Sequence, residues 1–159
     1  MTPTKKKNQV SVTNSSHANM AIRTGSAPSQ DEIRALEAEM LKAPQVDVST
    51  THLIHAGMYA RTVKIPAGTL VTGVPMSDDH VCIISGDITV TAGDDVIRFT
   101  GYNVIPASRG LKRIVYAHQE TSWTAIFKSG ATTVDDAEIE MSAEYNKLQS
   151  RGGGKCLEQ

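Results

Sequence analysis

Between residues 50 and 130 the hydrophobic positions fall in short runs, which turn residues interrupt at close intervals. The runs are rich in Val, Ile and Thr, and Gly, Pro and Asp stand between them. Runs of this kind predict β-strands joined by tight turns. The expected strands cover residues 58–65, 69–74, 80–84, 88–91, 96–99, 103–105, 111–118 and 123–128. Because no helical period separates them, residues 50–130 predict an antiparallel β-barrel or sandwich.

Three of the expected turns separate the middle strands. They lie at Ser85-Gly86-Asp87, at residues 92–95 and at Thr100-Gly101. Each contains glycine, which supplies backbone conformations that other residues adopt only at a cost. We therefore expect each of these strands to be short and to end at one of these turns.

A helical pattern precedes the strands. Ser29 followed by Glu32 is a capping box, in which each side chain satisfies a backbone amide at the start of a helix. Four apolar residues then fall on one face, and Pro44 ends the segment. The residues of this stripe are Ile33, Leu36, Met40 and Leu41. We expect a short amphipathic helix over residues 30–43, with the stripe buried against the barrel or a neighbouring subunit.

The two ends of the chain are polar and carry charges of opposite sign. Residues 1–29 contain three consecutive lysines and no acid, which predicts a flexible basic arm. Residues 131–148 are acidic and predict a short helical segment, and residues 149–159 form a Gly-rich tail. Opposite charges at the two ends suit contacts between copies of the chain, and two solvated surfaces explain them equally well.

The overall composition excludes several functions. A chain of 159 residues with 40% hydrophobic and 21% charged residues predicts one globular domain. Sixteen basic against seventeen acidic residues give no general attraction to nucleic acid, and an aromatic content of 4% leaves few rings for stacking on bases. No apolar run approaches a membrane span, and no signal peptide is visible. We expect no membrane or nucleic-acid partner and a protein that is not secreted.

The two cysteines occupy unlike settings. Cys82 lies within an apolar strand pattern and Cys156 in the polar tail. This usage predicts two reduced thiols, with Cys82 a small buried core residue.

The stretch Gly57-Met58-Tyr59-Ala60-Arg61-Thr62-Val63-Lys64-Ile65-Pro66-Ala67-Gly68, followed by Ser85-Gly86 and then by Gly101, Pro106 and Gly110, resembles a cupin. In particular, it is similar to the small single-domain cupins found among bacteriophage and prophage proteins. The most specific parts are residues 65–68 and 116–123, and the resemblance covers residues 51–130. It implies a jelly-roll barrel, commonly dimeric or of higher order, whose open mouth can hold a small ligand.

The resemblance also implies a metal site, which this sequence lacks in its usual form. Catalytic cupins hold a metal with two His and one Glu from a first motif and one His from a second. The Glu position falls on Asp79, no His stands near residues 72–74, and Arg113 occupies the last position. We therefore expect no metal and no other cofactor. The remaining alternative is a reduced site made of His80, His118 and Asp79.

The rest of the sequence offers little catalytic chemistry. His52 and His55 are three residues apart, which on a strand places them on opposite faces. The sequence contains no nucleophile elbow and no phosphate-binding glycine loop, so motifs typical of an enzyme are missing.

A pocket without metal is a separate possibility. Tyr59, Arg61, Val63 and Ile65 share one face of an expected strand, and the two apolar residues indicate that this face points inward. An inward arginine needs a partner, which is either a carboxylate of the chain, such as Asp79, or a small anionic ligand. The candidate ligand-binding residues are Tyr59, Arg61, His80, Arg113, Tyr116, His118 and Trp123.

Three functions fit these patterns. The favoured hypothesis is a non-enzymatic structural or assembly protein of a phage particle, in the virion or the host bacterial cytoplasm, whose N-terminal arm binds other copies and other particle proteins. The first alternative is a binder of a small ligand, for example a sponge for a host nucleotide signal. The second is a metal-free enzyme similar to sugar-nucleotide epimerases, with His118 or His80 as base and Tyr116 as acid.

Overall fold

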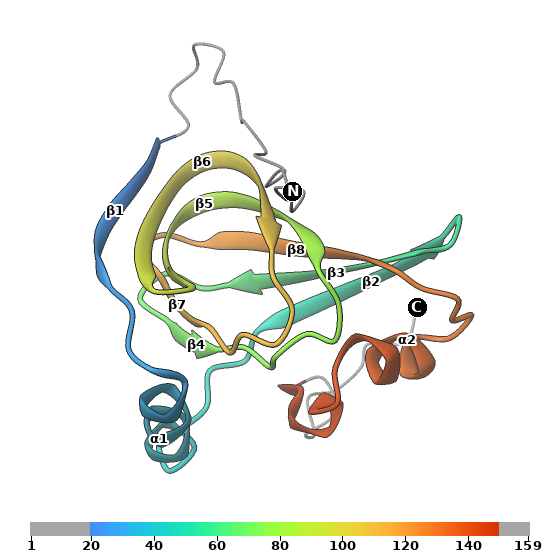
Figure 1. The fold of residues 1–159 in the computed structure, drawn as a ribbon, viewed down its shortest axis with the longest axis horizontal. Helices are drawn as coiled ribbons and strands as arrows, with labels where there is room; N and C mark the ends of the chain where they lie inside the picture. The colour runs from blue at the N-terminus through green and yellow to red at the C-terminus, as the bar shows by residue number, and fades with distance from the viewer. Residues whose placement is uncertain (1–19, 150–159) are drawn as a thin grey trace, which may run out of the picture.

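A computed structural model describes residues 20–149 as an antiparallel β-structure with two short α-helices (Figure 1). In chain order the elements are β1 (Met20–Ser26), α1 (Gln30–Met40), β2 (Ser49–His55), β3 (Met58–Ile65), β4 (Leu70–Thr72), β5 (His80–Ala92), β6 (Asp95–Ala107), β7 (Ile114–Ala117), β8 (Thr121–Lys128), α2 (Val134–Met141) and the 3-10 helix η1 (Tyr145–Lys147). The predictions for residues 1–19 and 150–159, which include most of the arm, the tail and Cys156, lie outside the described residues.

The strands pair in the order β1-β6-β5-β8-β3-β2, and β4 and β7 form a second wall. All the pairings are antiparallel. β5 belongs to both walls, because residues 81–85 pair with β8 and residues 88–90 pair with β7. β5 and β6 curl around the interior in Figure 1. The result is a barrel-like antiparallel fold.

Two turns expected from the sequence are instead parts of strands. Ser85-Gly86-Asp87 lies within β5, and Thr100-Gly101 lies within β6. Gly86 and Gly101 are cross-strand partners in one uninterrupted ladder. Glycine inside a strand often marks a bend or a close approach of backbone, and these two lie where the hairpin curls. The expected turn at residues 92–95 does connect the two strands.

The structure also contains two strands that the sequence did not predict. β1 occupies residues 20–26 of the stretch expected to be an arm and pairs with residues 95–100 of β6. β2 pairs with β3 across the turn at Ala56-Gly57, both of which have positive φ. The side chains of β1 are polar or exposed from Ala21 onward, so backbone pairing rather than burial fixes this strand.

The first helix starts as the capping box predicts. Ser29 accepts from the Glu32 amide, and the Glu32 carboxylate accepts from the Ser29 amide. Of the expected apolar stripe, Ile33 is buried, whereas Leu41 is exposed. The helix ends at Met40, before the expected boundary.

The interior contains two clusters of buried side chains. One cluster consists mainly of Ile, Val, Phe and Ala and lies around the second half of β5: Ile65, Ile84, Ile88, Val90, Phe99, Val115 and Ala117. The other includes Tyr59, Cys82 and Phe127 from the strands together with Ala137 and Met141 of α2. Helix α2 therefore covers one opening of the barrel, and the Met141 carbonyl accepts from the amide of Ser77.

Candidate functional site

The strand register places the polar interior residues in defined rows. Arg61 of β3 lies opposite Ala125 of β8, which lies opposite Cys82 of β5. His52 of β2 lies on the other side of Arg61. Ala125 and Cys82 have small side chains. Their row therefore leaves space on the interior side for the long side chain of Arg61 and for a residue of α2.

That residue is Glu138. Its side chain is 2% exposed, and its Oε1 atom lies 3.8 Å from the Nε atom of Arg61, whose side chain is 12% exposed. Arg61 thus points inward as the sequence indicates, and its carboxylate partner comes from the acidic C-terminal segment. Asp79 has a different role, because its Oδ1 atom accepts from the Arg109 amide at 2.9 Å. Burial lowers the pKa of the Arg61 guanidinium, against the effect of Tyr59 and Glu138.

Arg113 is the second arginine that reaches the interior. It precedes β7, and its charge is close enough to Cys82 and His80 to act on both. Burial lowers the pKa of Arg113, and within residues 20–149 no carboxylate lies within ion-pair distance of its side chain. Burial raises the pKa of the Cys82 thiol to about 11, so this residue is a protonated thiol.

Two histidines lie in the same interior region. His80 is 8% exposed and stacks on Phe127 with ring centroids 4.5 Å apart. The Nδ1 atom of His52 is hydrogen-bonded to the Tyr59 hydroxyl at 2.8 Å. Burial lowers the pKa of both imidazoles, and the nearby Arg113 and Arg61 lower the pKa of His80 and His52 further. Both rings are therefore neutral near pH 7. His55 is exposed, on the opposite face from His52, as its spacing predicts.

The structure separates the seven candidate ligand-binding residues into two groups. Tyr59, Arg61, His80, Arg113 and Trp123 face the interior. Tyr116 and His118 lie together on the outside, with ring centroids 4.9 Å apart, and His118 contacts Thr89. Strand alternation is the reason, because Val115 and Ala117 occupy the inward positions of β7. No acid–base pair of Tyr116 with an imidazole therefore faces the barrel interior.

The donor set does not fit the metal that a cupin resemblance implies. His80 is the first residue of β5, whereas His118 contacts Thr89 near the other end of that strand, so the two imidazoles are apart. Arg113 has no lone pair to donate to a cation. Among residues 20–149 there is no group of three or more His, Cys, Asp or Glu placed to hold a metal ion. That the protein holds no metal remains a prediction, which elemental analysis tests.

A small cavity lies between α2 and the barrel opening. Its volume is about 260 Å³. Tyr59, Phe127, Ala137 and Met141 give it an apolar lining, and its polar lining residues are Asp78, Lys128, Ser129 and Glu140. Ser129, which directly follows β8, donates to Glu140 at 2.6 Å and so ties the C-terminal end of α2 to the end of this strand. The interior arginines do not line this cavity.

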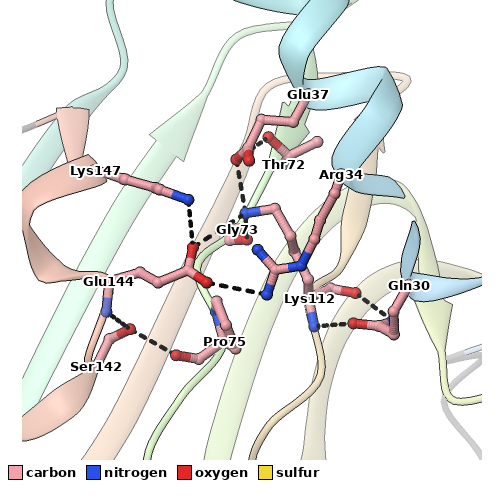
Figure 2. Close-up of polar contacts among 10 residues, drawn as sticks. All are labelled: Gln30, Arg34, Glu37, Thr72, Gly73, Pro75, Lys112, Ser142, Glu144 and Lys147. Carbon is pink, nitrogen blue, oxygen red and sulfur yellow. Dashed lines mark hydrogen bonds and ion pairs between the residues drawn. The ribbon is translucent and has the colours of Figure 1, made fainter. Parts of the chain in front are cut away.

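A second polar cluster, which sequence reasoning missed, surrounds Lys112 (Figure 2). The Lys112 side chain is fully buried, and its Nζ atom lies 2.6 Å from Glu37 of α1, 3.0 Å from the Gly73 carbonyl and 3.9 Å from Glu144. Glu144 also pairs with Arg34 and Lys147. The cluster therefore ties α1 and the segment around η1 to the barrel. Nothing in the sequence distinguishes Lys112 from an exposed lysine, so no signal marked it.

The comparisons with known proteins concern the fold. No protein-family model matches this sequence, and neither does any curated protein. The structure is similar to that of a protein with a cupin-2 domain from Shewanella frigidimarina (16% identity, TM-score 0.42, 58% of this chain and 91% of that chain). It is also similar to a cupin superfamily protein from Desulfitobacterium hafniense (15% identity, TM-score 0.46, 58% and 86%). A salicylate 1,2-dioxygenase from Pseudaminobacter salicylatoxidans is similar over 70% of this chain and 34% of its own length (12% identity, TM-score 0.48).

The chain has a mostly β, antiparallel fold with two short α-helices, and the solved structures to which it is similar include cupins. The phage setting that the sequence suggests has no counterpart among these three structures. No helix within residues 20–149 is long and apolar enough to cross a membrane.

Proposed function

We propose that this cupin-type protein is a non-enzymatic structural or assembly protein that binds neighbouring subunits of a larger particle. The observation that carries the proposal is an uncovered apolar surface on the outside of the sheet. Here we call it the outer face: the outward positions of β2, β3, β8, residues 81–85 of β5 and residues 102–106 of β6. It exposes Leu53, Met58, Val81, Tyr102 and Val104. Apolar patches of this kind mark interaction sites in soluble proteins.

The barrel interior supports the same proposal. α2 packs into one opening with Ala137, Glu138 and Met141 buried, and Arg61 already has a carboxylate partner within the chain. The setting of the particle, a phage virion or the cytoplasm of a host bacterium, rests on the sequence resemblance.

The N-terminal segment is the second contact that we propose. β1 fixes the chain against β6, and Met20, which follows the segment of residues 1–19, lies opposite Thr100. This segment carries Lys5, Lys6 and Lys7 and no acid. Acidic surface on a neighbouring subunit would complement those charges.

Deletion of residues 1–19 tests the proposal. The full-length protein should form assemblies larger than a dimer in sedimentation velocity, and the truncated protein should form smaller ones with the same melting temperature. Raised salt should also shift the full-length protein toward smaller assemblies, because salt screens exposed ion pairs. The proposal would be contradicted if the full-length protein stayed monomeric at every concentration from about 1 to about 200 μM, because a functional interface should form within that range.

The alternative function, binding of a small anionic ligand, is favoured by Arg113. This guanidinium reaches the barrel interior near Cys82 and His80 without a carboxylate partner among residues 20–149. A charge in such a place is costly unless it is paired, and phosphate or carboxylate groups match the guanidinium geometry.

Calorimetric titration with inorganic phosphate and with a nucleoside monophosphate tests this alternative. Binding with a dissociation constant below about 1 mM, equivalent to about 4 kcal/mol, should disappear in Arg113→Gln and persist in Arg109→Gln, which changes an exposed arginine four residues earlier. If both variants lose binding equally, or if the wild-type protein shows no binding heat, the barrel interior is not an anion site.

A further inference from the structure

The guanidinium of Arg61 is paired in charge, but one of its donors is unused. Its Nε atom lies 3.8 Å from Oε1 of Glu138, which is longer than a hydrogen bond. This buried Nε atom has no hydrogen-bond partner among residues 20–149. A guanidinium binds a carboxylate best through two parallel N–H···O bonds. Glu138 therefore balances the charge of Arg61 and leaves hydrogen-bonding capacity for a better-placed carboxylate.

Helix α2, which carries Glu138, is fastened to the barrel at its C-terminal end. The Met141 carbonyl accepts from the Ser77 amide at 2.8 Å, and the Ser142 hydroxyl donates to the Pro75 carbonyl at 2.6 Å. The chain enters the helix from β8 through a short loop that begins with a glycine, residue 130, around which an added Cβ atom would meet nothing within 4 Å. This arrangement suits a helix whose first turns lift from the opening while its end stays attached.

The cavity between α2 and the barrel adjoins the ion pair through neighbouring residues on both elements. On β3, Tyr59 lines the cavity and is the inward residue before Arg61, and on α2, Ala137 lines it and directly precedes Glu138. The apolar lining residues are buried, whereas the charged ones, Asp78, Lys128 and Glu140, are exposed. Helix α2 thus leaves about 260 Å³ of space with a buried apolar lining close to a buried guanidinium.

From these observations we infer that Arg61 anchors a site for a small carboxylate with an apolar body, and that Glu138 closes this site by taking the place of the ligand's carboxylate. The inference goes beyond the assembly function, and its site differs from the one considered at Arg113. When the first turns of α2 lift, the ligand's carboxylate accepts from two N–H groups of the guanidinium, and its apolar body fills the cavity. The structure thus shows a self-inhibited state, in which the chain's own helix supplies the competing carboxylate.

The charges around the site favour a single carboxylate over a more highly charged anion. Glu138 is only 2% exposed, so the barrel opening already accommodates one carboxylate beside Arg61. Of the charged residues that line the cavity, Asp78 and Glu140 are acidic and Lys128 is basic. A second negative group on the ligand would face the two acidic side chains, which disfavours it. The rest of the ligand is apolar, because buried aromatic and aliphatic side chains surround it.

Calorimetric titration of the full-length protein with hexanoate tests the inference, with hexanamide as the uncharged analogue. Glu138→Gln should bind hexanoate at least about 10-fold more tightly than the wild type, because the competing carboxylate is gone. Arg61→Gln should lose hexanoate binding, and hexanamide should not bind to either protein with comparable affinity. Ala137→Leu places a larger side chain in the cavity, so it should weaken the binding of hexanoate more than that of acetate.

The Glu138→Gln variant also loses a buried partner of Arg61, so its stability is measured in parallel. Hexanoate should raise the melting temperature of Glu138→Gln more than that of the wild type, because a ligand that binds the folded state stabilises it. If the variant is partly unfolded, hexanoate should restore the wild-type circular dichroism spectrum. Glu37→Gln is the matched control, since it removes a carboxylate from another buried pair, with Lys112. This control should lose stability without gaining affinity for hexanoate.

The outcomes separate this inference from the functions proposed above. Equal affinity of Glu138→Gln and the wild type for hexanoate, or no binding by either, overturns the self-inhibited site. Equal binding of hexanoate and hexanamide overturns the role of the carboxylate. In each case, assemblies that depend on residues 1–19 leave the assembly function standing, and phosphate binding that depends on Arg113 leaves the alternative standing.

Discussion

Arg61 and Glu138 meet inside the barrel although 77 positions separate them in the sequence. Nε of the arginine lies 3.8 Å from Oε1 of the glutamate, and within residues 20–149 this Nε atom has no hydrogen-bond partner. The pair connects β3 to the helix that covers the barrel opening, so the position of α2 depends on a buried charge on the strand.

Removing either member of this pair should destabilise the protein. Arg61→Ala and Glu138→Ala each leave a buried charge without its partner, which typically costs about 3 to 5 kcal/mol. The double variant Arg61→Met with Glu138→Leu should recover most of that loss, because it removes both charges and keeps apolar volume. Urea unfolding measures the three free energies. Arg23→Ala, which breaks an exposed pair with Asp95, is the control and should cost about 1 kcal/mol or less. Equal losses for the double and single variants would falsify the ion-pair explanation.

A second prediction concerns Lys112. Lys112→Met should lower the free energy of unfolding by about 3 kcal/mol or more, since it leaves Glu37 and Glu144 without the ammonium between them. Glu37 belongs to α1, so hydrogen exchange of the α1 amides should accelerate more than exchange of the β5 amides. Lys42→Met is the control, because the Lys42 side chain is 70% exposed and its one ion pair within residues 20–149 is with Glu39, near the end of α1. If α1 and β5 amides accelerate equally, the cluster stabilises the whole barrel and does not specifically hold the helix.

Local patterns predicted the parts of the fold that depend on neighbouring residues. The capping box located the start of α1, and alternation in residues 58–65 gave both the bounds of β3 and its inward face with Arg61. The turns predicted at Gly86 and Gly101 are wrong, because a glycine inside a curled strand and a glycine in a turn look alike in sequence. β1 has no hydrophobic alternation to reveal it, since its pairing with β6 uses backbone atoms.

The site was less accessible from sequence than the fold. The inward orientation of Arg61 followed from its strand, but its partner did not, because Glu138 is one of several acidic residues in the C-terminal segment and only the packing of α2 selects it. The burial of Lys112 likewise depends on three segments that meet in space. The predicted place of Tyr116 and His118 in the pocket is wrong, because Val115 and Ala117 occupy the inward positions of β7. The sequence pattern of this short strand did not indicate which of its faces points inward.

Stability should fall as the pH drops below about 6.5. Burial is the main reason why the folded-state pKa values of His52 and His80 lie below the ordinary value of 6.5. Between the folded and unfolded values the unfolded chain binds more protons, so the free energy of unfolding decreases with falling pH, by up to about 1.4 kcal/mol per pH unit for each histidine. Above pH 6.5 both histidines are neutral in the folded and in the unfolded state, so they no longer make the free energy of unfolding depend on pH. The carboxylates with lowered pKa values, Glu32, Asp87 and Glu144, act in the same direction only below about pH 4.5.

Melting temperatures at pH 8, 7, 6 and 5 measure this effect. His80→Gln should reduce the slope between pH 5 and 6.5 and leave the slope between pH 7 and 8 unchanged. A slope in His80→Gln as steep as in the wild type would show that the buried imidazole does not contribute to acid sensitivity.

The last prediction concerns Gly86, where β5 bends toward the start of β8. Its φ is +148°, and a Cβ atom at this position would lie 2.8 Å from the Cα atom of Thr121. Thr121 cannot move away freely, because it is completely buried and its hydroxyl accepts from the Asp87 amide at 3.1 Å. Gly86→Ala should therefore cost about 2 to 4 kcal/mol through overpacking and backbone strain. Gly93→Ala is the matched control, since Gly93 also has positive φ but has no atom within 4 Å of the added Cβ, so strain alone should cost about 1 to 2 kcal/mol. Chemical denaturation of both variants gives the difference, which contains the contact with Thr121 together with the greater backbone strain at φ +148° than at φ +61°. If the two losses are equal, the strand shifts to accommodate the methyl group, and the close approach of β5 to β8 at this bend is not a fixed constraint on the barrel.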